Sequence, residues 1–273
     1  MSSSAAVEAS SATDAAIELR EVSKSYSQGA GFAIRGIDLA IPRGAFLAII
    51  GGSGCGKTTT LKIVNRLIEP DNGEVLVDGT TVRSVPAYEL RRRIGYVFQG
   101  IGLFPHMSVA ENIGVTPRLL GWSAARIQQR VVELLQLVDL PADYGDRSPA
   151  MLSGGQRQRI GVARALAAKP SIMLMDEPFG ALDPVTRDAL GTQYRKLHEQ
   201  LNLTTVMVTH DVMEAVLLAD RIVVMRAGEI VAAGTPRQLM DDHCDQAVRE
   251  LMDMPRRQAE RIRSLLQGQS VDG

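Results

Sequence analysis

The stretch Gly51-Gly-Ser-Gly-Cys-Gly56-Lys57-Thr58 decides the fold class of this chain. It follows a short apolar run at residues 46–50 and precedes residues 58–67, where apolar side chains recur with the spacing of one helix face. A strand, a glycine-rich turn and a helix therefore follow one another. Such a turn lets several backbone N–H groups converge on phosphate oxygens beside the positive end of the helix. The stretch predicts a phosphate-binding loop in an α/β protein.

The side chains of this loop suit a nucleotide. Lys57 offers a mobile cation for phosphate oxygens, and Thr58 offers a hydroxyl for Mg²⁺. A glycine-rich turn without function is the alternative, but the flanking strand and helix argue against it. The loop residues expected to bind the nucleotide are Gly51, Ser53, Gly54, Cys55, Gly56, Lys57, Thr58 and Thr59.

Two carboxylates, Asp176 and Glu177, follow a second apolar strand at residues 172–175. Alone, such a pair is usually a solvated strand end. In doubly wound sheets, however, ligands bind just beyond the carboxyl ends of strands, so the same edge is expected to hold the phosphate loop and this pair. Asp176 then suits Mg²⁺, and Glu177 suits acceptance of a proton from the attacking water.

His210 follows a third predicted strand, residues 205–208, in the same way. A lone histidine is more often a structural hydrogen-bonding residue than a functional one. Because His210 is expected at the same sheet edge as the carboxylate pair, we interpret it as part of the site.

A second anion-binding helix start is predicted at Leu152-Ser153-Gly154-Gly155-Gln156. Ser153 is a good N-cap, and the exposed amides of Gly154 and Gly155 would bind an anion. One nucleotide does not need two such helix starts in separate parts of a chain. We therefore expect this one to bind the nucleotide of a second copy, which makes the working unit a dimer.

The rest of the chain fits an α/β core with a helical insertion. Further strands are predicted at residues 17–22 and 222–225, and helix signals dominate from about 87 to 168. These include a capping-box pattern at Ser108 and Glu111 and an amphipathic segment at 127–137. Asp183-Pro184 and Thr235-Pro236 mark two more helix starts. Residues 244–267 are expected to be helical, with a break or kink at Pro255.

Bulk properties exclude several classes of protein. The 273 residues are 45% hydrophobic and 22% charged, enough for a full core. A net charge of -1 gives no field that would attract nucleic acid, and Cys55 and Cys244 provide no disulfide framework. No apolar run reaches the roughly 18 residues that span a bilayer. Residues 1–14, rich in Ser and Ala, are predicted to be a disordered tail, not a signal peptide.

These motifs together resemble the ATP-binding-cassette (ABC) ATPases over residues 17–240. The loop at 51–58 matches their Walker A motif, residues 153–156 their signature, residues 172–177 their Walker B motif and His210 their switch histidine. Tyr26 resembles the aromatic residue that stacks on adenine, with an ordinary strand-end aromatic as the alternative. Gln99 resembles the Q-loop glutamine, which the family places beside the catalytic groups and Mg²⁺; its alternative is a surface amide. Ala181-Leu182-Asp183 resembles the D-loop.

The segment around Gln99, from Tyr96 to Ile113, and Leu119-Leu-Gly-Trp122 resemble importers of glycine betaine, choline and related osmoprotectants. In that group this loop faces the membrane subunits, which implies that Gln99 links nucleotide state to transport. Several of these importers carry a paired regulatory domain after the cassette. The 273 residues leave no room for one after the cassette, so no ionic-strength sensing by such a module is expected.

The resemblance implies a P-loop NTPase with a RecA-like α/β core, an antiparallel β subdomain and an inserted α-helical subdomain. The cassette is expected over residues 15–240, with a helical extension over 241–273 that stabilises the dimer or has no specific role. The implied activity is hydrolysis of ATP with Mg²⁺. The implied partners are a second ATPase subunit, membrane permease subunits and, indirectly, a substrate-binding protein, at the cytoplasmic face of the membrane.

Other functions remain as alternatives. An importer of amino acids or another small solute would share the same ATPase motifs. A soluble ATPase acting on DNA or ribosomes is disfavoured. Cassettes resembling DNA-repair proteins carry long coiled coils, and those resembling translation factors carry two cassettes in one chain, and this sequence shows neither feature. An exporter half would be expected to carry a fused membrane domain.

Overall fold

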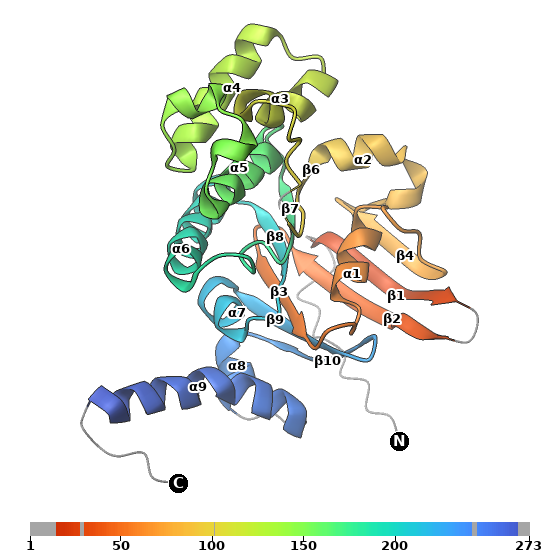
Figure 1. The fold of residues 1–273 in the computed structure, drawn as a ribbon. Coiled ribbons are helices and arrows are strands. Elements are labelled where there is room, and N and C mark those ends of the chain that lie inside the picture. Colours follow the sequence, from red (N-terminus) through yellow and green to blue (C-terminus); the bar gives the residue numbers. More distant parts are fainter. Residues whose placement is uncertain (1–14, 28–29, 101, 242–244, 267–273) are drawn as a thin grey trace.

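The fold is seen in a computed structural model that describes residues 15–27, 30–100, 102–241 and 245–266. The tail predicted for residues 1–14 lies outside this range, as does Cys244. The molecule has three parts (Figure 1). They are a mixed core sheet with its covering helices, a smaller antiparallel sheet, and a group of helices beyond one edge of the core sheet. Among the described residues, no helix combines the length and apolar character that a bilayer span needs.

The core sheet has the strand order β10-β9-β3-β8-β7-β6. Neighbours β9, β3, β8, β7 and β6 run parallel, and β10 is antiparallel to β9. Its strands are β3 (Phe46–Gly51), β6 (Ile94–Val97), β7 (Ile172–Asp176), β8 (Thr204–Val208), β9 (Arg221–Arg226) and β10 (Glu229–Gly234).

Helices cover both faces of this sheet, so its central strands are apolar on both sides. Along β3, Phe46 and Ala48 belong to one core cluster, and Leu47 and Ile49 belong to the other. The covering helices are α1 (Lys57–Val64), α6 (Pro184–Leu201), α7 (Val212–Leu218) and α8 (Pro236–Asp241). Helix α1 is shorter than the predicted 58–67, and Leu67 lies beyond its end and is exposed.

The smaller sheet has the order β2-β1-β4-β5 and is antiparallel throughout. Its strands are β1 (Ala15–Ser27), β2 (Ala30–Pro42), β4 (Asn72–Val77) and β5 (Thr80–Thr81). The apolar face of β1, with Ile17, Leu19 and Val22, packs into the same cluster as β3 and α1. The two sheets therefore share a core that holds the glycine loop in place.

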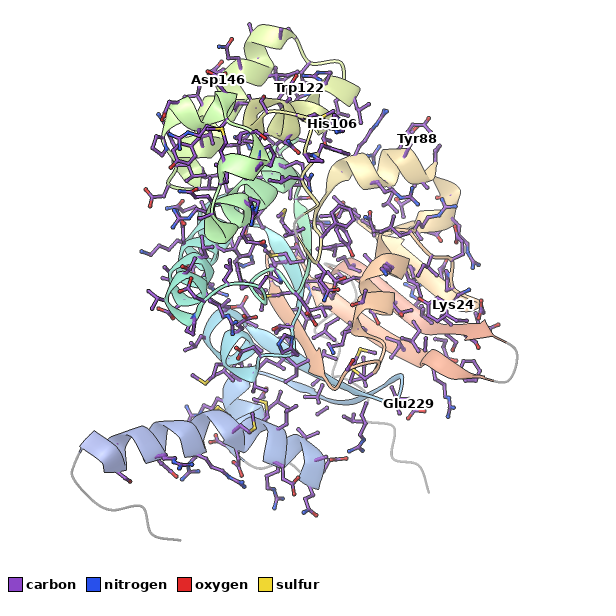
Figure 2. The ribbon with its side chains drawn as sticks, viewed as in Figure 1. Lys24, Tyr88, His106, Trp122, Asp146 and Glu229 are labelled. Carbon is purple, nitrogen blue, oxygen red and sulfur yellow. The ribbon has the colours of Figure 1, made fainter. Side chains whose placement is uncertain are left out.

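The third part of the molecule lies among the helices between β4 and β7. They are α2 (Ala87–Arg93), α3 (Val109–Leu119), α4 (Ala124–Leu137) and α5 (Gly154–Leu166), with 3₁₀ turns at Val82–Ser84, Ala142–Asp146 and Pro149–Met151. Ser108 caps α3 with the predicted capping box, completed by Glu111. Trp122, His106 and Asp146 lie at this helical end, opposite Lys24 and Glu229 (Figure 2).

The first part of the predicted helical insertion is not entirely helical in the structure. The span 87–168 contains the strand β6, which pairs in parallel with β7 as the edge of the core sheet. Gly95 lets β6 approach closely, because a Cβ there would meet Met173 Sδ at 2.3 Å and the Ala165 carbonyl oxygen at 2.7 Å. The helices that stand beyond the core sheet therefore begin after β6, at α3 (Figure 1).

The C-terminal helix α9 (Gln246–Leu266) packs its first part against α7 and α8 through the buried residues Val248 and Met252. The break expected at Pro255 was wrong, because the helix continues through this position. A proline inside a helix removes one N–H donor, and α9 nevertheless extends from Gln246 to Leu266.

Candidate nucleotide site

The glycine loop between β3 and α1 has the backbone that the sequence predicted. Gly56 is the N-cap of α1 with φ 106°, a conformation that side chains rarely adopt. A Cβ at Gly51 would lie 2.2 Å from the Met225 carbonyl oxygen, and one at Gly56 would lie 2.4 Å from that of Ala33. Strands β9 and β2 thus approach the loop so closely that only glycine fits at these positions.

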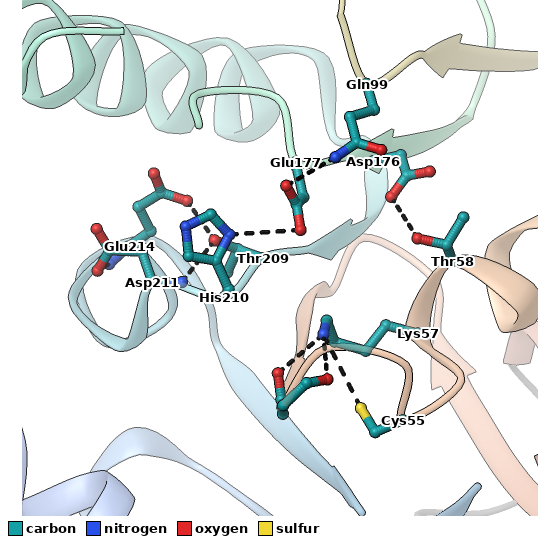
Figure 3. Close-up of polar contacts among 12 residues, drawn as sticks. Cys55, Lys57, Thr58, Gln99, Asp176, Glu177, Thr209, His210, Asp211 and Glu214 are labelled. Atoms are coloured by element: carbon teal, nitrogen blue, oxygen red, sulfur yellow. Dashed lines mark hydrogen bonds and ion pairs between the residues drawn. The ribbon is translucent and has the colours of Figure 1, made fainter. Parts of the chain in front are cut away.

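Lys57 is buried, and its ammonium group folds back over the loop. Nζ donates to the carbonyl oxygens of Gly51 at 2.8 Å and Gly52 at 3.0 Å, and the Cys55 sulfur lies 3.9 Å away (Figure 3). An ammonium group has three donors. Two are held by the carbonyl oxygens, and the third is left facing a thiol, which is a weak acceptor. The loop therefore presents a cation with donor capacity for an anion.

Thr58 and Asp176 join the loop to the end of β7. The Thr58 hydroxyl donates to Asp176 Oδ1 at 2.9 Å (Figure 3). Burial raises the pKa of Asp176, although the Thr58 hydrogen bond and the nearby Lys62 oppose this shift. Burial also raises the pKa of Tyr96, and the charge of Asp176 contributes. A hydroxyl and a partly desolvated carboxylate form the kind of oxygen pair that Mg²⁺ prefers, so these residues fit that ion.

Glu177 lies at the centre of a second contact group, formed with Gln99 and His210. Gln99 Nε2 donates to Glu177 Oε2 at 3.0 Å, and His210 Nδ1 lies 3.3 Å from Glu177 Oε1 (Figure 3). Glu177 has φ 46°, and its amide donates to the Val208 carbonyl oxygen at 2.9 Å. The chain thus turns sharply after β7 and points this carboxylate toward the ends of β6 and β8.

Tyr26 lies near the end of β1, in the smaller antiparallel sheet. Its side chain is 61% exposed, and its hydroxyl lies 3.2 Å from Thr59 Oγ1 of α1. This contact places an exposed aromatic ring beside the phosphate loop, where the base of a nucleotide could stack.

The second helix start has the predicted cap. Ser153 Oγ accepts from the Gln156 amide at 3.2 Å, and Gln156 Oε1 accepts from the Ser153 amide at 2.9 Å. We call Lys57, Thr58, Asp176, Glu177, Gln99 and His210 the Lys57 group. Within the described residues, no hydrogen bond or ion pair joins this group to Ser153, Gly154, Gly155 or Gln156. The structure therefore brings together Lys57, Thr58, Asp176, Glu177, Gln99 and His210, and leaves this helix start outside their contacts.

Asp183 caps α6, as predicted. Its carboxylate accepts from the Thr186 amide at 3.0 Å. Hydrogen bonding with the Thr186 side chain, and then with its amide, lowers the pKa of Asp183. Helices α5 and α6 begin close together, because a Cβ at Gly155 would lie 2.7 Å from Thr186 Cγ2. Asp183 therefore belongs with the second helix start.

The residues that hold His210 in place were not predicted from the sequence. The Thr209 hydroxyl donates to Glu214 Oε2 at 2.7 Å (Figure 3). Asp211 caps α7 by accepting from the Met213 amide at 2.8 Å. Burial raises the pKa of Glu214, while its hydrogen bond from Thr209 opposes the shift. An aspartate before an apolar helical segment is a cap signal, so Asp211 was predictable from sequence. Glu214 has no comparable local signal.

Comparison with known proteins places these features in a family. The ABC transporter family matches residues 34–180. A glycine betaine/carnitine/choline transport ATP-binding protein, OpuCA of Bacillus subtilis, is 52% identical over 240 residues, covering 88% of this chain and 63% of its own. A glycine betaine uptake system ATP-binding protein, YehX of Escherichia coli, is 50% identical over 234 residues, covering 86% of this chain and 75% of its own.

Solved structures share the fold. The dimeric post-hydrolysis state of the ATP-binding cassette MJ0796, bound to ADP and Pi, aligns with a TM-score of 0.73 and 35% identity over 80% of this chain and 98% of that one. The chain spans 63% of the length of the Bacillus subtilis relative. The resemblance stated from the motifs and the expected fold class are thereby confirmed.

Proposed function

The chain belongs to the ABC transporter family, and from this membership and the geometry of the site we propose that it is the ATP-hydrolysing subunit of an osmoprotectant importer. The observation on which the proposal depends is the meeting of four strand ends, those of β3, β8, β7 and β6. There, the phosphate loop, the Thr58–Asp176 pair and the Glu177–Gln99–His210 group lie at one edge of the core sheet.

Each group has a role in this proposal. The loop amides and Lys57 bind the phosphates of ATP, and Tyr26 stacks on its adenine. Thr58, Asp176 and Gln99 hold Mg²⁺, which neutralises phosphate charge. Glu177 positions the attacking water and accepts its proton, and His210 stabilises the charge of the γ-phosphate. Phosphoryl transfer depends mainly on such positioning and charge neutralisation.

We propose that the helix start at Ser153, Gly154, Gly155 and Gln156 closes over the ATP of a second copy, together with Asp183. The separation of this helix start from the Lys57 group supports that arrangement. So does the similarity to a cassette that is dimeric with ADP and Pi bound. The dimer then works with membrane permease subunits and, through them, a substrate-binding protein, as a peripheral subunit on the cytoplasmic face of the membrane.

The proposed solutes are quaternary amines such as glycine betaine, choline and carnitine. The names of the relatives support this class. The ATPase subunit does not touch the solute, so its own residues do not select it. The test is ATPase activity of the complex reconstituted with its permease and binding protein, compared between quaternary amines and amino acids. Stimulation by amino acids alone would favour an amino-acid importer instead.

The ATPase assignment is tested with two substitutions in the purified chain. Glu177→Gln keeps the size of the side chain but removes the proton acceptor, so it should retain ATP binding, lose turnover and accumulate as a dimer in gel filtration with ATP. Lys57→Ala should abolish ATP binding, because the loop loses its buried cation. Normal turnover in the Glu177→Gln variant would remove Glu177 from its proposed role.

A further inference from the structure

Arg187 lies in the first turn of α6 and bonds to two segments at once. Its Nη2 donates to the Leu182 carbonyl oxygen at 3.0 Å, directly before Asp183. Its Nη1 donates to Asp211 Oδ2 at 3.0 Å, directly after His210. The planar guanidinium group suits such a bridge, because its donors point in fixed directions. One side chain thus connects the start of α6 to the start of α7.

The segment on the α7 side is held tightly around His210. The Asp211 amide donates to Thr209 Oγ1 at 3.0 Å, and the Thr209 hydroxyl donates in turn to Glu214 Oε2. Both neighbours of His210 are therefore fixed, while the imidazole itself is 61% exposed and faces Glu177. A displacement of Asp211 moves the backbone on which His210 is carried.

The segment on the α6 side belongs to the second helix start. Thr186, next to Arg187, packs against Gly155 of α5 so closely that a Cβ at Gly155 would lie 2.7 Å from its methyl group. The beginnings of α5 and α6 must therefore move together. In the proposed dimer this is the surface that meets the nucleotide of the partner copy.

We propose that Arg187 is a positioning residue. It couples the starts of α5 and α6, which bind the ATP of the partner copy, to His210, which acts on the ATP in its own chain's site. This inference rests on the proposed dimeric ATPase function. When the starts of α5 and α6 close over the partner's nucleotide, Arg187 pulls on Asp211 and sets His210 and Glu177 for hydrolysis. Binding of ATP within the chain's own site does not need this link, because Lys57 and Thr58 are on other elements.

A pair of buried atoms indicates in which direction the link tightens. Arg187 Nε and Glu214 Oε1 face each other at 3.6 Å, and neither has a hydrogen-bond partner among the described residues. An N–H···O bond needs about 2.9 Å. A small approach of α6 toward α7 therefore completes a third hydrogen bond from the guanidinium group, in addition to those with Leu182 and Asp211. That gain favours the closed arrangement.

The test is steady-state ATPase kinetics of the full chain. Arg187→Lys keeps a positive charge near Asp211 and Glu214 but lacks the planar set of donors. We expect kcat to fall about tenfold or more, because small misplacements of reacting groups have large effects on rate, with KM for ATP within about twofold. Arg187→Ala should behave alike, with a larger fall. In a Glu177→Gln background, ATP-dependent dimer formation should persist with Arg187→Lys.

Arg195 provides the matched control. It lies on the same helix, its side chain is 27% exposed like that of Arg187, and it also joins α6 to α7, through the Leu218 carbonyl oxygen. If Arg187 only docks the two helices, Arg195→Ala and Arg187→Ala should lower the melting temperature and kcat by similar amounts.

The outcomes separate the two proposals. A fall in kcat confined to the Arg187 variants supports the coupling. The coupling is overturned if kcat is unchanged in Arg187→Lys, if only KM rises, or if kcat falls equally in Arg195→Ala. In each of these cases, hydrolysis by the wild type still upholds the proposed function. Absence of hydrolysis in the wild type overturns both.

Discussion

Replacement of Gly56 by alanine should destabilise the protein far more than the same replacement at Gly54, two residues earlier in the loop. Both glycines have positive φ, 106° at Gly56 and 76° at Gly54. They differ in their surroundings. A Cβ at Gly56 would lie 2.4 Å from the Ala33 carbonyl oxygen and 2.6 Å from Ile34 Cγ2, whereas one at Gly54 would have nothing within 4 Å.

The expected loss of unfolding free energy has two sources, backbone strain at positive φ and steric clash of the new Cβ. Holding an alanine at positive φ costs roughly 1–3 kcal/mol at either position. At Gly56 the clash with strand β2 adds roughly 1–3 kcal/mol, because overpacking forces the backbone to shift. The difference between the two variants is therefore about 1–3 kcal/mol of unfolding free energy. For a domain of this size, each kcal/mol corresponds to a change of roughly 2–4 °C in melting temperature.

The assay is urea unfolding of both variants and the wild type without nucleotide, with the slope of unfolding free energy against urea compared first. Equal slopes with a lower midpoint for Gly56→Ala than for Gly54→Ala would agree with the contact geometry. Equal midpoints would refute it, because backbone strain alone would then explain both effects.

Three further predictions concern buried polar groups. Asn112 is fully buried; its side chain accepts from the Phe104 amide and donates to the Phe104 carbonyl oxygen. Asn112→Asp turns a carboxylate toward that carbonyl oxygen, so urea unfolding should show the unfolding free energy lowered by roughly 3–5 kcal/mol at neutral pH and by less in acid. Burial raises the pKa of Glu214, so its contribution to stability is present below its unfolded pKa of about 4.3 and is lost as pH rises through the folded value. Glu214→Gln should therefore gain stability relative to wild type as pH rises from about 4.3 through the folded pKa of Glu214. A difference in stability that stays constant across this interval would contradict the prediction. Tyr194→Phe removes the hydrogen bond to Thr205 at 2.9 Å and should cost about 1 kcal/mol, with no change in ATP affinity by fluorescent-nucleotide titration.

Local signals in the sequence predicted the parts of this fold that depend on near neighbours. The capping residues Ser108, Ser153 and Asp183 all accept the expected backbone hydrogen bonds, because a cap is formed within one turn of its helix. The apolar strands β3, β7, β8 and β9 were recognised because each is buried on both faces.

The strand β6 was not recognised for the opposite reason. It has four residues, includes Gly95 and follows directly after α2, so its own pattern is too short to distinguish it from the helices around it. Its extended conformation is stabilised by pairing with β7, which comes more than 70 residues later. Similarly, the helix through Pro255 overrides a local breaking signal.

The sequence by itself determined the phosphate loop, the caps and the family, since each depends on residues that are adjacent in the chain. Only the tertiary structure decided which groups meet: Gln99 with Glu177, Thr58 with Asp176, and Arg187 with Asp211 and Glu214. The physical reason is the strand order, because β3, β8 and β7 are neighbours in the sheet but distant in the chain. Hydrogen bonding between these strands, together with burial of both faces, brings their ends to one edge, and no local pattern specifies the distances there.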